Sequence, residues 1–88
     1  MPIEIVEKEH IGYLNIISAK EDHSEELKTK LNEAQRLGNE FKSKAVITFN
    51  TTIGAKRVDT TVWAVTEKYI QLKNNIHIPL KSLIDIDF

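Results

Sequence analysis

The stretch that decides the fold is residues 58–88, VDTTVWAVTEKYIQLKNNIHIPLKSLIDIDF, which carries most of the β-strand signal and the only tryptophan of the chain. Its β-branched and aromatic residues favour strands, and Asn74-Asn75 suits the positive φ angles of a two-residue hairpin turn. Residues 62–65, VWAV, are all apolar, whereas a strand with one side in water alternates apolar with polar residues. The sequence therefore predicts a strand covered on both faces. A curled barrel, an N-terminal hairpin or a second subunit would each complete that cover.

The segment before this block predicts the one helix of the chain. Apolar residues recur at spacings of three and four from Leu27 to Phe41, which places them on one helix face. Asp22 suits the N-cap, and Gly-Asn at residues 38–39 offers the left-handed residue that commonly closes a helix. We therefore expect a helix over about residues 23–37.

Further strands are predicted on either side of this helix. Residues 44–52 and 56–66 predict a hairpin that turns near Gly54, and residues 3–6 can pair with residues 11–18 in a second hairpin. The predicted fold class is α+β, with one amphipathic helix packed on a strongly bent antiparallel sheet or small β-barrel and a short N-terminal strand or hairpin. With 88 residues, the whole chain is expected to form a single small domain.

The composition argues against several classes of function. The net charge is −1, so no whole-domain field draws the protein to nucleic acid or acidic lipid, although a local patch can still bind them. The absence of cysteine excludes disulfides, thiolate nucleophiles and Cys-type zinc sites. No apolar run approaches the roughly 20 residues of a membrane helix, and acidic residues near the N-terminus do not suit a signal peptide. We therefore expect a cytoplasmic protein.

No pattern in the sequence predicts catalysis or a cofactor. His10, His23 and His77 lie in different predicted elements without metal-ligand spacing, and the glycines are isolated. Asp85 and Asp87 share a strand face, where solvated aspartates that discourage edge pairing are the simpler interpretation. We expect no catalytic residue, no metal, no cofactor and no enzyme activity.

Two binding hypotheses remain. In the first, Trp63, Val65 and Tyr69 form an apolar patch that a second copy or another protein buries, so that the chain is a non-catalytic interaction module that self-associates. In the second, the protein binds single-stranded nucleic acid or lipid phosphate, with bases stacked on Trp63. The phosphate-binding residues of this second hypothesis are basic side chains of the same predicted sheet, namely Lys56, Arg57, Lys68 and Lys73.

The C-terminal strands resemble two groups of small β domains. Val65-Thr66, Tyr69-Ile70, Leu72 and Ile78-Pro79-Leu80 carry the likeness to Sm-like or SH3-like barrels and to bacterial PH-like or GRAM-like domains. The order of elements also looks like that of an uncharacterised family of small bacterial proteins. The resemblance implies a ligand-binding barrel or PH-like module, and the position of the helix before the strands favours the barrel.

Overall fold

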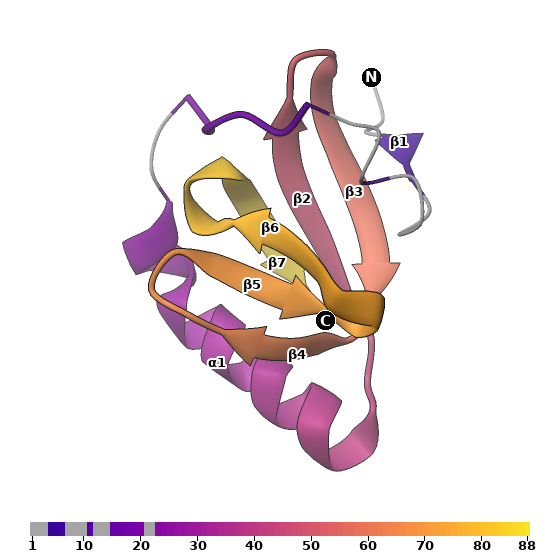
Figure 1. Cartoon of the computed structure of the whole chain (residues 1–88). Coiled ribbons are helices and arrows are strands. Elements are labelled where there is room, and N and C mark those ends of the chain that lie inside the picture. Colours follow the sequence, from indigo (N-terminus) through magenta and orange to yellow (C-terminus); the bar gives the residue numbers. More distant parts are fainter. Residues whose placement is uncertain (1–3, 7–10, 12–14, 21–22) are drawn as a thin grey trace.

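The computed structural model describes residues 4–6, 11, 15–20 and 23–88 and has an α+β fold, as predicted. One helix, α1 (Ser24–Phe41), packs against two small sheets (Figure 1). The first sheet has the order β1-β3-β2-β7 and consists of β1 (Glu4–Ile5), β3 (Gly54–Thr60), β2 (Ala45–Thr51) and β7 (Leu83–Asp87). The second sheet has the order β4-β5-β6 and consists of β4 (Val62–Val65), β5 (Tyr69–Leu72) and β6 (Ile76–Pro79). Two short 3-10 turns, η2 (Lys73–Asn75) and η3 (Leu80–Ser82), flank β6.

The helix forms where the apolar spacing predicts it, but both of its ends differ from the expectation. Leu27, Leu31 and Ala34 are buried at 5 %, 2 % and 3 % exposure, on the face that packs against β4 and β7. The N-cap position is taken by His23, which makes no side-chain capping hydrogen bond, and the predicted cap Asp22 lies outside the described residues.

The helix does not close at residues 38–39 but continues to Phe41. Gly38 lies inside the helix at its contact with β4, where a Cβ atom would lie 2.5 Å from the carbonyl oxygen of Val62. The glycine is needed there for close approach of two backbones rather than for a positive φ. Lys42 takes the left-handed conformation instead, with φ 55° and ψ 32°, and its N–H donates to the Gly38 carbonyl at 3.0 Å.

The strand predicted over residues 56–66 is two strands in different sheets. β3 ends at Thr60 and pairs with β2, whereas β4 begins at Val62 and pairs with β5. Thr61 lies between them, 7 % exposed, and its carbonyl accepts a hydrogen bond from the Lys73 N–H at 3.2 Å. Because the chain changes sheet here, the described strands do not close into the barrel that was one form of the prediction.

The N-terminal segment completes the edge of the first sheet. β1 pairs in parallel with β3, and the Val6 N–H donates to the Arg57 carbonyl at 2.7 Å. Ile16 makes an isolated antiparallel bridge to Thr51 of β2. For the residues that the structure describes, the predicted pairing of residues 3–6 with 11–18 is therefore wrong. The open edge of β3 offers unpaired backbone groups that β1 satisfies.

The core lies between the helix and the two sheets. Each strand from β2 to β7 contributes buried side chains to it. Phe49, Val58, Ile70, Ile78 and Ile86 are among them, each no more than 1 % exposed. Within the described part of the chain, no helix is long and apolar enough to cross a membrane.

Candidate functional site

A β-bulge in β4 turns the only tryptophan away from the core. Val62 is opposite Leu72 and Ala64 is opposite Gln71, so the pairing shifts between Val62 and Ala64 and leaves Trp63 as the extra residue. Val62 is fully buried, whereas Trp63 is 45 % exposed. A bulge redirects side chains in this way, and it explains how four consecutive apolar residues fit without a cover on both faces.

The same bulge corrects the predicted faces of β4. Strict alternation places Trp63 and Val65 on one face, but Val65 is half-buried and packs against the core. The extra residue shifts the alternation by one position, so Val65 returns to the side of Val62. Trp63 is therefore the most exposed member of the apolar quartet.

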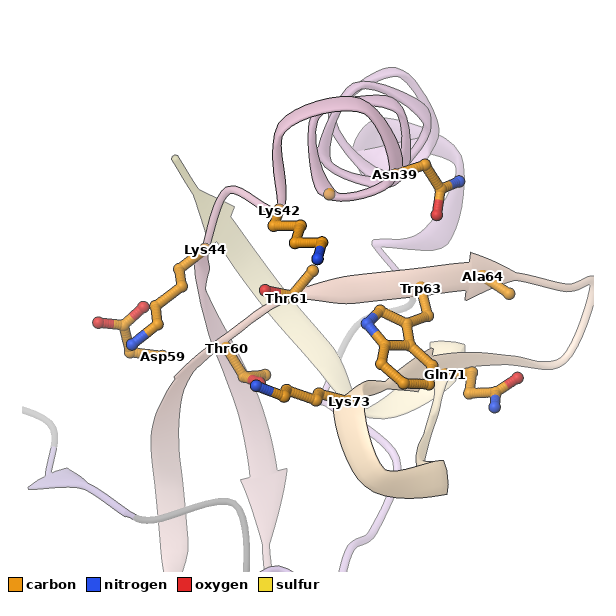
Figure 2. A pocket seen from close by; sticks show the side chains of 11 residues that line it. Asn39, Lys42, Lys44, Asp59, Thr60, Thr61, Trp63, Ala64, Gln71 and Lys73 are labelled. Atoms are coloured by element: carbon orange, nitrogen blue, oxygen red, sulfur yellow. The ribbon is translucent and has the colours of Figure 1, made fainter.

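Trp63 lies in a groove of about 670 Å³ between the C-terminal end of α1 and the seam of the two sheets (Figure 2). This volume falls within the roughly 300–1,000 Å³ typical of small-molecule sites. We call it the Trp63 groove, and its lining residues are Gly38, Asn39, Lys42, Lys44, Asp59, Thr60, Thr61, Trp63, Ala64, Gln71 and Lys73.

The charge of the Trp63 groove is positive although the whole chain is slightly acidic. Lys42, Lys44 and Lys73 contribute three positive charges and Asp59 contributes one negative charge, which leaves a local net charge of +2. All four of these side chains are exposed to solvent. The groove thus combines an exposed aromatic face with ammonium groups, which are of the type that bind anions through charge-assisted hydrogen bonds.

Each lysine is held by a different part of the backbone. Lys42 ends α1, Lys44 precedes β2 by one residue, and Lys73 begins η2. The Lys73 N–H donates to the carbonyl of Thr61, which fixes the start of η2 against the junction of the two sheets. Residues distant in sequence thereby line the same groove, in which the Lys42 and Lys73 side chains lie nearer the Trp63 ring and the Lys44 side chain points away from it toward Asp59 (Figure 2).

Lys42 is an unexpected residue at its backbone position. A left-handed conformation costs a residue with a Cβ about 1–2 kcal/mol, and glycine usually occupies the position after a helix for this reason. Lys42 nevertheless holds φ 55° and lines the Trp63 groove. An unfavourable backbone conformation kept at a candidate site supports a role for its side chain.

The two side-chain amides of the groove lie apart from the lysines. In Figure 2, Asn39 and Gln71 are on one side of the Trp63 ring, and the ammonium groups of Lys42, Lys44 and Lys73 are on the other. The Gln71 side-chain nitrogen donates to the Asn75 side-chain oxygen at 2.8 Å, which orients this amide. Amides supply both donors and acceptors and suit the polar edge of a heterocycle.

The residues predicted from sequence to bind a partner are not all brought together. Val65 faces away from Trp63, and Tyr69 is half-buried with its ring centroid 4.5 Å from that of His77. Of the four basic residues proposed to contact phosphate, only Lys73 lies in the Trp63 groove. The other three lie on β3 or in the turn between β4 and β5, namely Lys56, Arg57 and Lys68.

Sequence reasoning missed Asn39, Lys42, Lys44 and Gln71. Lys42 and Lys44 stand next to the boundary between the helix and β2, within the string FKSKAV. Two lysines flanking a helix end are a weak signal by themselves, because exposed helix ends are commonly polar. Their meaning depends on a contact between that helix end and β4, which the glycine at residue 38 permits.

Several of the residues considered as general acids or metal ligands form ion pairs or lie outside the described part of the chain. The Asp85 carboxylate pairs with the Lys30 ammonium at 3.2 Å, and His23 Nδ1 lies 3.3 Å from a carboxylate oxygen of Glu26. His10 lies outside the described residues. Among the residues that the structure describes, no group of three or more His, Cys, Asp or Glu side chains is arranged to hold a metal ion.

One ion-pair cluster on the helix shifts a pKa. Arg36 hydrogen-bonds to Glu33 and, through its other terminal nitrogen, donates to the Glu40 carboxylate at 3.1 Å. The hydrogen bond from Arg36, together with its positive charge, holds the pKa of the Glu33 carboxyl below its ordinary value of 4.5. This exposed cluster lies outside the Trp63 groove and is suited to stabilising the helix surface.

A second groove of about 500 Å³ lies between the N-terminal half of α1 and the end of β4. Its lining residues are Glu25, Lys28, Leu31, Asn32, Val65, Thr66, Glu67 and Leu80. Two carboxylates and one lysine leave a local net charge of −1, and among the residues that the structure describes no aromatic side chain lines this groove. The Trp63 groove is therefore the better candidate site.

Comparison of the chain with protein-family models, with curated proteins and with solved structures found no match. The resemblance to Sm-like and PH-like domains stays a prediction. The functional argument consequently rests on the residues and the geometry of the Trp63 groove.

Proposed function

We propose that this protein is a non-catalytic binding module that holds single-stranded nucleic acid in the Trp63 groove. The observation that carries the proposal is the bulge that exposes Trp63 in a groove lined by three lysines. Proteins that bind single strands combine aromatic side chains, on which bases stack, with cations that follow the backbone. Both parts are present in one groove of this chain.

Stacking on Trp63 would supply much of the binding free energy. A base stacked on an aromatic side chain contributes about 1–3 kcal/mol by alanine substitution. The lysines would add an electrostatic contribution that salt weakens, because binding of phosphates releases counterions from the nucleic acid. With the chain as a whole at −1, this attraction is local, and we expect it to fall off beyond the groove.

The charge of the groove favours an anionic ligand over a second copy of the same surface. In a two-fold symmetric dimer, each residue near the axis meets its own counterpart. Such a dimer across the Trp63 groove would place Lys42, Lys44 and Lys73 of both copies against one another. Like charges brought together at an interface oppose association, whereas phosphates compensate them.

A binding role also fits the surroundings of the charged groups better than a catalytic one. A general acid or base is commonly tuned by burial or by a neighbouring charge. The four charged side chains of the Trp63 groove are all exposed, which suits attraction of a ligand more than transfer of a proton. The proposal places the protein in the cytoplasm, where single-stranded RNA is available.

Titration with an oligonucleotide tests the proposal directly, because Trp63 is the only tryptophan and reports contact with a base by quenching of its fluorescence. We expect quenching by an unstructured oligonucleotide at low salt, and a slope of log affinity against log salt between about −1.4 and −2.1, as for two or three contacted phosphates. Calorimetry with Trp63→Ala should show binding about 5- to 150-fold weaker, by loss of stacking of roughly 1–3 kcal/mol.

Matched lysine variants separate the groove from the general surface. Lys73→Ala and Lys42→Ala remove a charge from the Trp63 groove, whereas Lys68→Ala removes the same charge from the turn between β4 and β5. The first two should weaken binding and reduce the salt slope by about 0.7 each, and the third should change little. Absence of binding at low salt, or an equal loss in Lys68→Ala, contradicts the proposal.

Self-association is a second candidate, favoured by large apolar side chains that are exposed outside the Trp63 groove. Phe41 is 67 % exposed at the end of α1, and Phe88 is 54 % exposed after β7. A small domain gains core by burying such side chains against a second copy. Sedimentation over a range of concentrations measures it, and a strict monomer at every concentration contradicts it.

A further inference from the structure

The Trp63 groove has its cations at one end only. In Figure 2 the ammonium groups of Lys42, Lys44 and Lys73 lie on the side toward which the indole nitrogen of Trp63 faces, and the amides of Asn39 and Gln71 lie on the opposite side. The indole N–H is a hydrogen-bond donor, so the positive end also presents a donor from the stacking residue itself. The site thus has an anion end and a neutral polar end.

The surface beyond the neutral end does not continue the positive charge. The turn that follows β4 carries Glu67 and Lys68, whose charges cancel. On the helix next to Asn39, the carboxylate of Glu40 is paired with Arg36. An internal stretch of a single strand has a phosphate on both sides of each base, and only one of those phosphates would meet the lysines.

The amount of charge also distinguishes the end of a strand from its interior. A bridging phosphodiester carries one negative charge, whereas a terminal phosphate monoester carries about 1.5 to 2 at pH 7. The three lysines and Asp59 give the groove a net charge of +2. A terminal phosphate therefore matches the groove more closely in charge than an internal phosphate does.

We infer that the Trp63 groove binds the phosphorylated end of a single strand, with the terminal base on Trp63 and the terminal phosphate between Lys42 and Lys73. This inference rests on the proposed function, because it concerns the same groove and the same ligand class. It adds that the protein distinguishes a strand end that carries a phosphate from one that carries a hydroxyl.

Three unlabelled oligonucleotides of one unstructured sequence test the inference: one with hydroxyls at both ends, one with a 5′-phosphate and one with a 3′-phosphate. Quenching of Trp63 and calorimetry give the dissociation constants without a label that would block an end. We expect one of the phosphorylated oligonucleotides to bind roughly tenfold more tightly than the hydroxyl form, as for one added charge-assisted hydrogen bond. Equal affinity of all three overturns the inference.

Two variants assign the preference to the anion end. Lys73→Gln should reduce the ratio of the affinities for the phosphorylated and the hydroxyl oligonucleotides. Asn39→Ala should leave that ratio unchanged, because Asn39 lies at the neutral end. A reduction of the ratio in Asn39→Ala equal to that in Lys73→Gln contradicts the assignment. Competition by inorganic phosphate as strong as that by the phosphorylated oligonucleotide also contradicts it, since the base would then contribute nothing.

The pH dependence of the ratio supplies an independent readout. The second pKa of a phosphate monoester is about 6, so the terminal phosphate loses its second charge as the pH falls from 7.5 to 5.5. Among the described residues, the charged side chains that line the groove are the three lysines and Asp59, and neither His23 nor His77 lines it. The preference for the phosphorylated over the hydroxyl oligonucleotide should decline several-fold between pH 7.5 and 5.5. An affinity ratio that stays constant over this pH range overturns the inference.

The outcomes separate this inference from the proposed function. Binding of all three oligonucleotides with equal affinity, still lost in Trp63→Ala, leaves the proposed function standing and removes end recognition. Absence of binding by every oligonucleotide removes both.

Discussion

Substitution of Gly38 by alanine tests the contact that positions the helix end over β4. A Cβ atom at this position would lie 2.5 Å from the Val62 carbonyl oxygen and 3.0 Å from the Thr61 methyl carbon. The first distance is about 0.8 Å shorter than a close C–H···O contact of roughly 3.3 Å. The Val62 carbonyl belongs to the backbone of β4 and is fixed by the sheet. The C-terminal end of α1 must therefore move instead.

For Gly38→Ala, the expected change in the free energy of unfolding is opposite in sign to that of a glycine-to-alanine substitution at an ordinary helix position. Glycine to alanine in a helix interior stabilises by about 1 kcal/mol, whereas crowding in a packed interior costs about 1–3 kcal/mol. For Gly38→Ala we expect a net loss of about 1 kcal/mol, which lowers the Tm of a domain of this size by about 4–8 °C. The displacement should also weaken ligand binding, since Asn39 and Lys42 move with the helix end.

Urea denaturation followed by circular dichroism measures the free energy of unfolding, with Thr29→Ala as the matched control. Thr29 is exposed within α1, so alanine there should stabilise by a few tenths of a kcal/mol through helix propensity alone. A gain of about 1 kcal/mol in Gly38→Ala, as at an open helix position, would refute the close approach of Gly38 and Val62.

Three further substitutions test other parts of the structure. Lys42→Gly should raise the free energy of unfolding by about 1 kcal/mol in urea denaturation, because glycine adopts the left-handed conformation freely, while calorimetry shows weaker oligonucleotide binding. Arg36→Gln should return the pKa of Glu33 upward toward 4.5 in an NMR titration. The depressed pKa stabilises the folded state above pH 4.5, and this stabilisation is lost as the pH falls below that value. The variant should therefore lack this pH dependence of the free energy of unfolding. Ser82→Ala should lower the free energy of unfolding by about 1 kcal/mol, because the Ser82 hydroxyl is fully buried and donates to the Pro79 carbonyl at 2.6 Å; no change contradicts that hydrogen bond's contribution.

The spacing of apolar residues along the chain predicted the helix and the strands wherever these elements are regular. The helix stripe at Leu27, Leu31 and Ala34 is buried as expected, and the α+β class follows from that stripe and the strand-rich C-terminal part. Gly38 misled the prediction of the helix end, because the sequence alone does not distinguish a glycine that adopts a positive φ from one that permits close approach. The distinction depends on the position of β4, which is set by the tertiary fold.

The bulge was the second feature that periodicity did not predict. A period of two places Trp63 and Val65 on the same face, and an inserted residue reverses every side chain that follows it. The sequence carries no glycine in β4 to signal such an irregularity. The hypothesis that Trp63 serves binding nevertheless stays consistent with its 45 % exposure.

The candidate site was predicted in part. Trp63 and Lys73 were both identified, since both belong to the strand-rich block that contains the tryptophan. Lys42 and Lys44 were not, because they join the site only through the packing of the helix end against β4. Lys56 and Arg57 are near Trp63 in sequence, but the change of sheet at Thr61 separates the strands that carry them.

The passage of the chain through Thr61 from one sheet to the other has a mechanical consequence. The Trp63 groove lies across this seam, with Asp59 and Thr60 from one sheet and Trp63 and Gln71 from the other. A ligand held there would contact both sheets, so the stabilisation that it provides would extend across the seam. At a concentration one hundred times the Kd, it would raise the free energy of unfolding by about 2.7 kcal/mol. Amide hydrogen exchange should therefore slow in both sheets when the groove is occupied.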